Sequence, residues 1–318
     1  MNDKIYGKII QGVGGLYSVR ITNAKQDIIA TTVSCRARGA FRHNNLSPLA
    51  GDNVILSYIG NDSKEATEEY VIEEICERKN SLIRPPLANL DYLFITLAAA
   101  SPKPILSTVD KLISIAEFNE IEPIIVITKC ELDTEYANKL KEIYTNSGFT
   151  VFCLSAAENI GIEAIYEFIK TALPCKLAAF AGASGIGKST LLNRLFPTLS
   201  LSTAEISKKI QRGKHTTRKV ELFPITFEND LSKCGYIADT PGFSMLDFER
   251  FDFFEKDDLV YTMREFRPYI NHCKYTKCSH TKEEGCAILE ALKNGQIEHT
   301  RHESFCELYN VLKVKTKW

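Results

Sequence analysis

Residues 182–190 read Gly182-Ala183-Ser184-Gly185-Ile186-Gly187-Lys188-Ser189-Thr190, which is the Gly-x-x-x-x-Gly-Lys-Ser spacing of a phosphate-binding loop. An apolar run, Leu177 to Ala181, precedes the loop, and an apolar helical pattern begins at residues 191–195. The sequence therefore predicts a strand, a glycine-rich loop and a helix. In such a loop the backbone N–H groups face phosphates, Lys188 adds positive charge and Ser189 can bind Mg²⁺.

A second pattern, Thr128-Lys129-Cys130-Glu131, follows the apolar run Ile124 to Ile127. GTPases place the motif Asn-Lys-x-Asp after such a strand, because a carboxylate can accept the two adjacent N–H donors of guanine. Thr128 and Glu131 stand where that motif has Asn and Asp, and Asp133 lies two residues too late for the role. We expect all four residues of this segment to contact a guanine base.

Ser155 and Ala156 follow another apolar run, Val151 to Leu154. GTPases hold a backbone segment against the guanine oxygen at the corresponding point. The pair has little weight alone, but its spacing from residues 128–131 fits, so both residues are predicted to bind the base.

The order of these patterns is unusual. In an ordinary GTPase the phosphate loop comes first and the base-reading motif follows, whereas here residues 128–131 precede residues 182–190. The order predicts a circularly permuted GTPase. Asp239-Thr-Pro-Gly242 follows the apolar run Tyr236 to Ala238 and completes the set, with Asp239 near the metal and Gly242 at the γ-phosphate.

Residues 207–219 lie between the phosphate loop and Asp239 and contain six basic residues and no acid. Thr217, together with Ser189, is predicted to bind Mg²⁺ when this segment closes over a triphosphate, although a solvated basic loop is the alternative. Phe243 stands where many GTPases have a water-orienting glutamine. His215 is therefore the candidate to orient water, with Lys188 and Thr217 as the other catalytic residues, or else it contacts phosphate or RNA.

Near the C-terminus, Cys273, Cys278, His280 and Cys286 follow the spacing Cys-x₄-Cys-x-His-x₅-Cys. Three thiolates and one imidazole form the closed tetrahedral set of a structural zinc site. His272 is an alternative to His280, and a disulfide is the alternative to the metal.

Residues 1 to about 75 contain five short β-rich runs, which predict a small barrel: Lys8–Ile10, Leu16–Thr22, Ile28–Val33, Asn53–Ile59 and Tyr70–Ile75. Arg36, Arg38 and Arg42 lie between the third and fourth runs, beside Phe41 and without an acid. Oligonucleotide-binding barrels often present such a surface to RNA, so these arginines are candidate RNA contacts, with a solvated loop as the alternative.

Apolar runs alternate with amphipathic stretches from about residue 80 and predict a doubly wound, mostly parallel sheet covered by helices. One of these helices is expected to start at Ser107 with Asp110 in its first turn. Two helical stretches end the chain. The predicted fold is multidomain α/β: an oligonucleotide-binding (OB) type β-barrel at 1–75, a permuted P-loop GTPase domain at 76–244 and a mainly helical zinc-binding domain at 245–318.

Bulk composition limits the partners. The chain has 318 residues with 39 Lys and Arg against 40 Asp and Glu, so nucleic-acid binding has to come from local patches. The start lacks a signal-peptide pattern, and the longest apolar stretch is shorter than the roughly 20 residues of a membrane helix. We expect a soluble, cytoplasmic monomer that does not contact membranes.

The order of all these patterns resembles the RsgA family of GTPases, also called the YjeQ or YloQ family. The similarity spans the chain and includes the segments Arg38-Gly39 to Arg42, Gly51-Asp52, Arg84-Pro85, Arg212 to Thr217 and Gly285-Cys286-Ala287.

The resemblance implies a protein that binds the 30S ribosomal subunit and its 16S rRNA late in assembly. It also implies zinc, Mg²⁺ with GTP, and hydrolysis of GTP to GDP stimulated by the ribosome. Two alternatives stay open from the residues alone: a P-loop ATPase or kinase, and a nucleotide-gated RNA-binding module in which hydrolysis is incidental.

Overall fold

The computed structural model describes residues 4–23, 31–38, 41, 47–59, 70–197, 220–227, 230–239 and 254–314. The chain forms two compact units. The first contains residues 1–91, 169–179 and 212–243, and the second contains residues 92–168, 180–211 and 244–318. Each unit groups segments that are distant in sequence, and the division at residues 75 and 244 stays a prediction.

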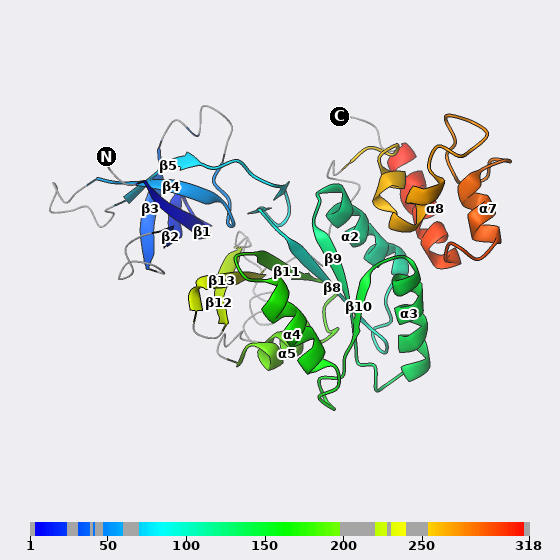
Figure 1. The fold of residues 1–318 in the computed structure, drawn as a ribbon, viewed down its shortest axis with the longest axis horizontal. Helices are drawn as coiled ribbons and strands as arrows, with labels where there is room; N and C mark the ends of the chain where they lie inside the picture. Colours follow the sequence, from blue (N-terminus) through cyan, green and yellow to red (C-terminus); the bar gives the residue numbers. More distant parts are fainter. Residues whose placement is uncertain are drawn as a thin grey trace, which may run out of the picture. The chain divides into compact units, whose positions relative to one another are not determined.

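Five strands of the first unit form the predicted barrel (Figure 1). Its strands pair in the order β1-β2-β3-β5-β4, and β4 pairs again with β1, which closes the barrel. Ile9, Val19 and Ile72 are fully or almost fully buried at its centre, with Cys35 and Val54. The strands are β1 (Ile5–Val13), β2 (Leu16–Asn23), β3 (Thr32–Ala37), β4 (Asn53–Tyr58) and β5 (Tyr70–Ile75).

The third strand differs from its prediction. The sequence favoured Ile28–Val33, whereas β3 spans Thr32–Ala37. Its register is fixed by the buried side chain of Cys35, which alternates with exposed Ser34 and Arg36. The run Ile28–Val33 is rich in apolar and β-branched residues and is therefore a stronger strand signal than this alternation, which explains the difference.

Gly51 and Asp52, which come immediately before β4, stabilise the barrel. Gly51 has φ +91°, and a Cβ there would lie 2.0 Å from the Ala88 carbonyl oxygen, so only glycine fits. Asp52 is buried and accepts two hydrogen bonds from Arg78, at 2.7 and 2.8 Å. Asp52 is therefore a structural residue of the barrel.

The second unit contains three parallel strands in the order β10-β9-β8, which are β10 (Thr150–Cys153), β9 (Glu122–Thr128) and β8 (Tyr92–Ala98). Helices α2 (Leu106–Phe118) and α3 (Thr134–Asn146) pack on these strands. Tyr92 and Phe94 project from one face of β8 toward Phe168 of α4 (Ile162–Ala172). Phe94 also stacks on Phe180, with ring centroids 4.6 Å apart.

In the first unit, β11 (Leu177–Ala181) pairs in parallel with β13 (Asp230–Asp239), and β12 (Glu221–Phe227) pairs with β13 in the antiparallel sense. Both β11 and β13 were predicted, and β12 was missed. Pro224 lies inside β12 and is atypical of a strand, which explains the omission. The small hairpin of β6 (Ser81–Leu82) and β7 (Leu87–Ala88) follows the barrel.

The predicted start of the first helix is wrong. Helix α2 begins at Leu106, its N-cap is Ile105, and no side chain caps it. Asp110, expected in a capping role, is 1% exposed and forms an ion pair with Arg301 in the interior. Val109, Leu112 and Ile113 are buried on the apolar face of α2.

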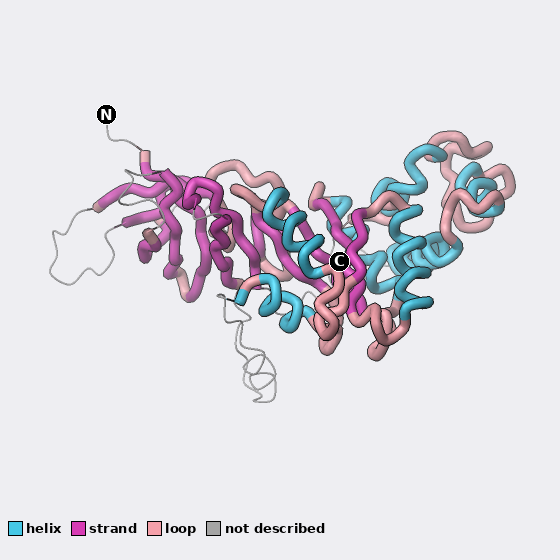
Figure 2. The backbone as a smooth tube through the Cα atoms, turned by 60° about the horizontal axis from the view of Figure 1, so that its bottom comes forward, coloured by secondary structure: helices cyan, strands magenta, loops and turns pink. Residues whose placement is uncertain are grey.

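The C-terminal part contains two short 3₁₀ helices, η2 (Leu259–Thr262) and η3 (Arg264–Tyr269), and two α-helices, α7 (Ala287–Lys293) and α8 (His299–Val314). Helix α8 lies beside α2 in the second unit (Figures 1 and 2). Phe305, Leu308 and Leu312 form its buried face.

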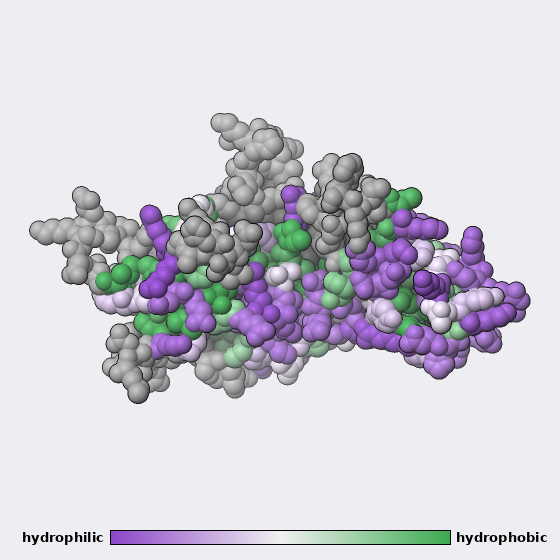
Figure 3. All heavy atoms as spheres, turned by 90° about the horizontal axis from the view of Figure 1, so that it is seen from above, coloured by the Kyte–Doolittle hydropathy of each residue, from purple (hydrophilic) through white to green (hydrophobic). Residues whose placement is uncertain are grey.

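Figure 3 shows one face of the molecule coloured by hydropathy, and hydrophilic side chains dominate the visible surface of the C-terminal part. Within the described residues, no helix is both long and apolar enough to cross a membrane.

Candidate nucleotide-binding site and metal centre

The predicted phosphate loop connects β11 to α5 (Lys188–Leu195), as the sequence indicated. Gly182 has φ +138°, and a Cβ there would lie 2.3 Å from the Thr96 carbonyl oxygen of β8. The loop therefore passes too close to β8 for any other residue. Lys188 donates hydrogen bonds to the carbonyl oxygens of Gly182 and, at 3.3 Å, Ala183, so its ammonium lies over the loop.

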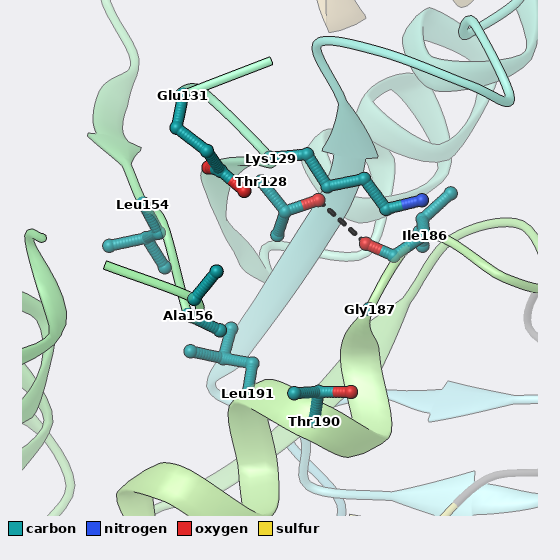
Figure 4. A pocket seen from close by; sticks show the side chains of 10 residues that line it. Thr128, Lys129, Glu131, Leu154, Ala156, Ile186, Gly187, Thr190 and Leu191 are labelled. Atoms are coloured by element: carbon teal, nitrogen blue, oxygen red, sulfur yellow. Dashed lines mark hydrogen bonds between the residues drawn. The ribbon is translucent and has the colours of Figure 1, made fainter. Parts of the chain in front are cut away.

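A pocket of about 170 Å³ lies between the predicted base-reading segment and the phosphate loop. Glu131 stands on one side, and Thr190 and Leu191 of α5 stand on the other (Figure 4). The remaining lining residues are Thr128, Lys129, Leu154, Ala156, Ala157, Ile186 and Gly187. Apolar walls with one carboxylate at the rim suit a flat, polar-edged ring such as a nucleobase.

Glu131 carries the clearest ligand signal. Its Oε2 atom is buried and, among the described residues, has no hydrogen-bond partner. Buried carboxylate oxygens are rarely left in this state, because desolvation without a hydrogen bond is costly. A ligand that offers N–H donors would satisfy this oxygen.

Lys129 connects the pocket to the phosphate loop. Its backbone has φ +57°, an uncommon value for a residue with a side chain, and such strain clusters at functional sites. Its Nζ atom donates to the carbonyl oxygens of Ser101, at 2.6 Å, and Gly185, at 3.0 Å. Thr128 Oγ1 donates to the Ile186 carbonyl oxygen at 2.6 Å.

Two predicted base contacts do not line the pocket. The Cys130 thiol hydrogen-bonds Cys153, which raises the pKa of Cys130 and lowers the pKa of Cys153 to about 7. Ser155 is fully buried, and its Oγ accepts the Glu158 N–H at 3.1 Å. Both residues hold the backbone of the loops that bear Glu131 and Ala156. Asp133 caps α3 by accepting the Tyr136 N–H at 3.0 Å.

Asp239 ends β13, immediately after Ala238, which pairs with Ala179 of β11. Its side chain, together with His215, Thr217, Gly242 and Arg42, lies outside the described residues. Ser189 is the second residue of α5 and half-buried, next to Lys188. The hydroxyl of Ser189 therefore lies at the helix N-terminus, where an Mg²⁺ bound to phosphates would need it.

Cys273, Cys278, His280 and Cys286 place one ligand atom each within 4.8 Å of one another. The Sγ atoms of Cys273 and Cys286 are 3.8 Å apart, and each lies 3.5 Å from His280 Nδ1. A tetrahedral zinc ion, with bonds of about 2.3 Å to sulfur and 2.0 Å to nitrogen, separates its ligands by roughly these distances. The residues therefore fit zinc. His272 is exposed and outside the cluster, and all ten cysteines are free of disulfides.

Glu283, which the sequence reading missed, closes the loop that bears His280. Its carboxylate accepts hydrogen bonds from the Ser279 hydroxyl and from the N–H groups of Ser279, Thr281 and Lys282, at 3.0 to 3.2 Å for the N–H donors. Burial alone would raise the pKa of Glu283, but these hydrogen bonds outweigh it and hold the pKa at about 2. The fixed loop keeps His280, at φ +58°, in its ligand position.

Arg36 and Arg38 lie at the end of β3 on the barrel surface, and both are exposed. Arg38 Nη1 is 3.1 Å from Glu73 Oε1, and both side chains are about half exposed. Surface pairs of this kind are weak, so Arg38 can exchange Glu73 for another anion at little cost.

The sequence matches two families of known proteins. Residues 75–249 match the RsgA GTPase family, and residues 6–66 match the RsgA N-terminal domain. A "Small ribosomal subunit biogenesis GTPase RsgA" from Ruminiclostridium cellulolyticum is 39% identical over 312 residues, covering 96% of this chain and 93% of the relative. The protein of the same name from Bacillus subtilis is 37% identical, covering 96% and 97%.

Two solved structures are similar over nearly the whole chain. The crystal structure of YloQ, "a circularly permuted GTPase", has a TM-score of 0.75 and 32% identity and covers 100% of this chain and 98% of its own. YjeQ from Thermotoga maritima has a TM-score of 0.77 and 29% identity, covering 98% and 100%. The permuted order predicted from the motifs is therefore confirmed, and this chain belongs to the RsgA family of circularly permuted GTPases.

Proposed function

We propose that this GTPase acts in assembly of the small ribosomal subunit, binding the 30S particle through its 16S rRNA and hydrolysing GTP when the particle stimulates it. The family membership supports the general role, since the curated relatives carry the name "Small ribosomal subunit biogenesis GTPase". We expect the protein to act as a monomer in the cytoplasm. The observation that supports nucleotide binding is the buried Oε2 atom of Glu131, which has no hydrogen-bond partner among the described residues, in a pocket beside the phosphate loop.

In the proposed mechanism, the pocket binds guanine, with Glu131 accepting its adjacent N–H donors and Ala156 contributing backbone near its oxygen. The loop from Gly182 to Gly187 surrounds the phosphates. Lys188 gives up its hydrogen bonds to the carbonyl oxygens of Gly182 and Ala183, and its positive charge then neutralises the phosphates. Ser189 and Thr217 would hold Mg²⁺, which neutralises phosphate charge when bound. By their place in the sequence, Asp239 would contribute near the metal and Gly242 near the γ-phosphate.

The hydrolytic step needs a group to orient water, and Phe243 offers no hydrogen-bonding atom. We assign this task to His215 in the complex with the ribosomal particle. Turnover of the isolated protein is then expected to be slow and to rise when the ribosomal particle is present.

The RNA-binding part of the proposal rests on Arg36, Arg38 and Arg42 of the barrel, which form a local basic group on a chain of nearly balanced charge. Zinc would hold the loop from Cys273 to Cys286 in shape without taking part in the reaction, because four protein ligands leave no open position.

The deciding experiment measures GTP turnover by the full chain alone, with purified 30S subunits and with 50S subunits. Stimulation by 30S alone supports the proposal, and it should disappear in Lys188→Ala. The matched control is Lys103→Ala, an exposed residue paired with Asp133. Equal turnover under all three conditions would favour a binding module with incidental hydrolysis.

A further inference from the structure

Two adjacent residues of the base-reading segment bind two adjacent carbonyl groups of the phosphate loop. Thr128 Oγ1 donates to Ile186 O at 2.6 Å, and Lys129 Nζ donates to Gly185 O at 3.0 Å. Figure 4 shows the first of these bonds crossing from β9 to the loop. The two segments are thus joined directly by two hydrogen bonds.

The Thr128 hydroxyl has no proton left to donate to a further acceptor. Its two hydrogen-bond neighbours are the carbonyl oxygens of Ile186, at 2.6 Å, and Leu97, at 3.2 Å. Both are acceptors, and a threonine hydroxyl has a single proton. The N7 and O6 atoms of guanine are also acceptors, so they require a donor that Thr128 cannot supply while it holds Ile186.

The position of the carbonyl groups also fixes the neighbouring N–H groups. In a planar trans peptide the C=O and the following N–H point in opposite directions. When Lys129 and Thr128 hold the carbonyls of Gly185 and Ile186, the N–H groups of Ile186 and Gly187 are directed away from the base-reading segment. These N–H groups belong to the part of the loop that surrounds phosphates.

Burial strengthens this constraint. Thr128 is only 6% exposed and Ile186 is 3% exposed, so water cannot replace the hydrogen bond between them. On the other side of the loop, Gly182 lies against the Thr96 carbonyl of β8. The loop is therefore held at both ends of its turn by strands β8 and β9.

We propose that Thr128 is a positioning residue for the phosphate loop and does not read the base. Guanine selectivity then rests on Glu131, and Thr128 contributes equally to every nucleotide that carries phosphates. This inference rests on the assignment of the pocket as the guanine site in the proposed function.

The test compares Thr128→Val, which removes the proton at nearly constant volume, with Thr128→Ser, which keeps it. Affinities for GTP, 7-deaza-GTP, ATP and guanosine are measured for the full chain. The expected result for Thr128→Val is a loss of about tenfold for all three triphosphates, with little change for guanosine. Thr128→Ser should recover most of the triphosphate affinity.

The selectivity ratios separate positioning from base reading. The ratios of GTP to ATP and of GTP to 7-deaza-GTP should be the same in the wild type and in Thr128→Val. A GTP preference over 7-deaza-GTP that Thr128→Val abolishes would overturn the proposal, and so would a loss of guanosine affinity equal to the loss for GTP.

Thr134→Val is the matched control, because Thr134 Oγ1 also donates to a carbonyl of this segment, that of Cys130 at 3.3 Å, but is exposed and does not contact the loop. It should leave all four affinities unchanged. A different variant tests the pocket assignment itself. If Glu131→Gln leaves the ratio of GTP affinity to ATP affinity unchanged, the guanine site is elsewhere, whatever the result for Thr128→Val.

Discussion

Arg301 of α8 and Asp110 of α2 form an ion pair in the interior, with 2.5 Å between Nη1 and Oδ1 and almost no exposure of either side chain. Glu265 of η3 binds the same guanidinium, at 2.7 Å from Nε. Although burial alone would lower it, the two carboxylates raise the pKa of Arg301, so its charge is permanent. The C-terminal helix is thus attached to α2 by a charge cluster that excludes water.

Removal of one partner should be far more damaging than removal of a surface pair. Arg301→Met leaves Asp110 buried without its cation and should lower the free energy of unfolding by about 3 to 5 kcal/mol. Urea titration followed by circular dichroism measures the change. Arg267→Met is the control, since Arg267 is half exposed and pairs with Glu117, and it should cost about 1 kcal/mol or less. Arg301→Met also leaves Glu265 without its cation, so the triple variant Arg301→Met/Asp110→Leu/Glu265→Leu should recover stability, and if it does not, packing and not charge explains the loss.

Guanine binding should depend on the Glu131 carboxylate. Glu131→Gln replaces an acceptor with a group that presents a donor, so GTP affinity is expected to fall about 10- to 100-fold while ATP affinity stays unchanged. Calorimetric titration of both nucleotides provides the measurement. Glu158→Gln is a suitable control, because Glu158 is exposed in the neighbouring loop and does not line the pocket.

Zinc should hold the loop from Cys273 to Cys286. Purified protein is expected to contain one zinc per chain, and a strong chelator should increase hydrogen exchange in this loop more than in the barrel. Cys278→Ser should lose the metal. Cys306→Ser should retain it, because Cys306 lies outside the cluster. Unchanged exchange after complete metal removal would contradict a structural role.

Gly182 should be irreplaceable for steric reasons. Gly182→Ala places a methyl group against the Thr96 carbonyl, so we expect loss of nucleotide binding and a destabilisation above about 2 kcal/mol. Gly148→Ala is the control, since Gly148 has φ +86° with nothing within 4 Å of its Cβ position. It should cost about 1 kcal/mol, from backbone strain alone, and leave binding intact. Equal effects of the two variants would show that close approach to β8 is unimportant.

The pH dependence of stability should reveal Lys8. Burial lowers the pKa of Lys8 from its ordinary 10.5, while Asp91 and Asp52 oppose the shift. Between the lowered value and 10.5, the unfolded chain binds more protons than the folded one, so the free energy of unfolding rises with pH. Lys8→Met should remove this dependence, so the stability of the wild type relative to Lys8→Met should rise as the pH approaches 10.5. Lys4→Met, at an exposed position, should follow the wild type, and parallel curves for wild type and Lys8→Met would contradict the assignment.

Sequence reasoning was most accurate where local chemistry allows only one structure. The phosphate loop had a strand before it and a helix after it, and the observed strand, Leu177–Ala181, has the predicted bounds. The four candidate zinc ligands were predicted from their spacing, and the structure brings those ligand atoms together. In both cases the chemistry is carried by residues close in sequence.

Long-range contacts were beyond prediction. Asp110 was interpreted as a helix-start residue because its partner, Arg301, is 191 positions away. The pocket residues Thr190 and Leu191 could not be joined to Glu131 by spacing. The role of Glu283 could not be predicted from the sequence. Its carboxylate accepts hydrogen bonds from backbone N–H groups of its own loop, and no pattern of side chains indicates such contacts.

The connection between Asp91 and Leu177 has a consequence for how the protein is made. Asp91 donates its N–H to the Leu177 carbonyl at 2.8 Å, and its carboxylate accepts the Leu177 N–H at 2.9 Å, across 86 positions. During synthesis from the N-terminus, the barrel strands find their partners early. Asp91 must instead wait for its partner until β11 has left the ribosome, so in this permuted chain part of the first unit can close only after the middle of the chain has been made.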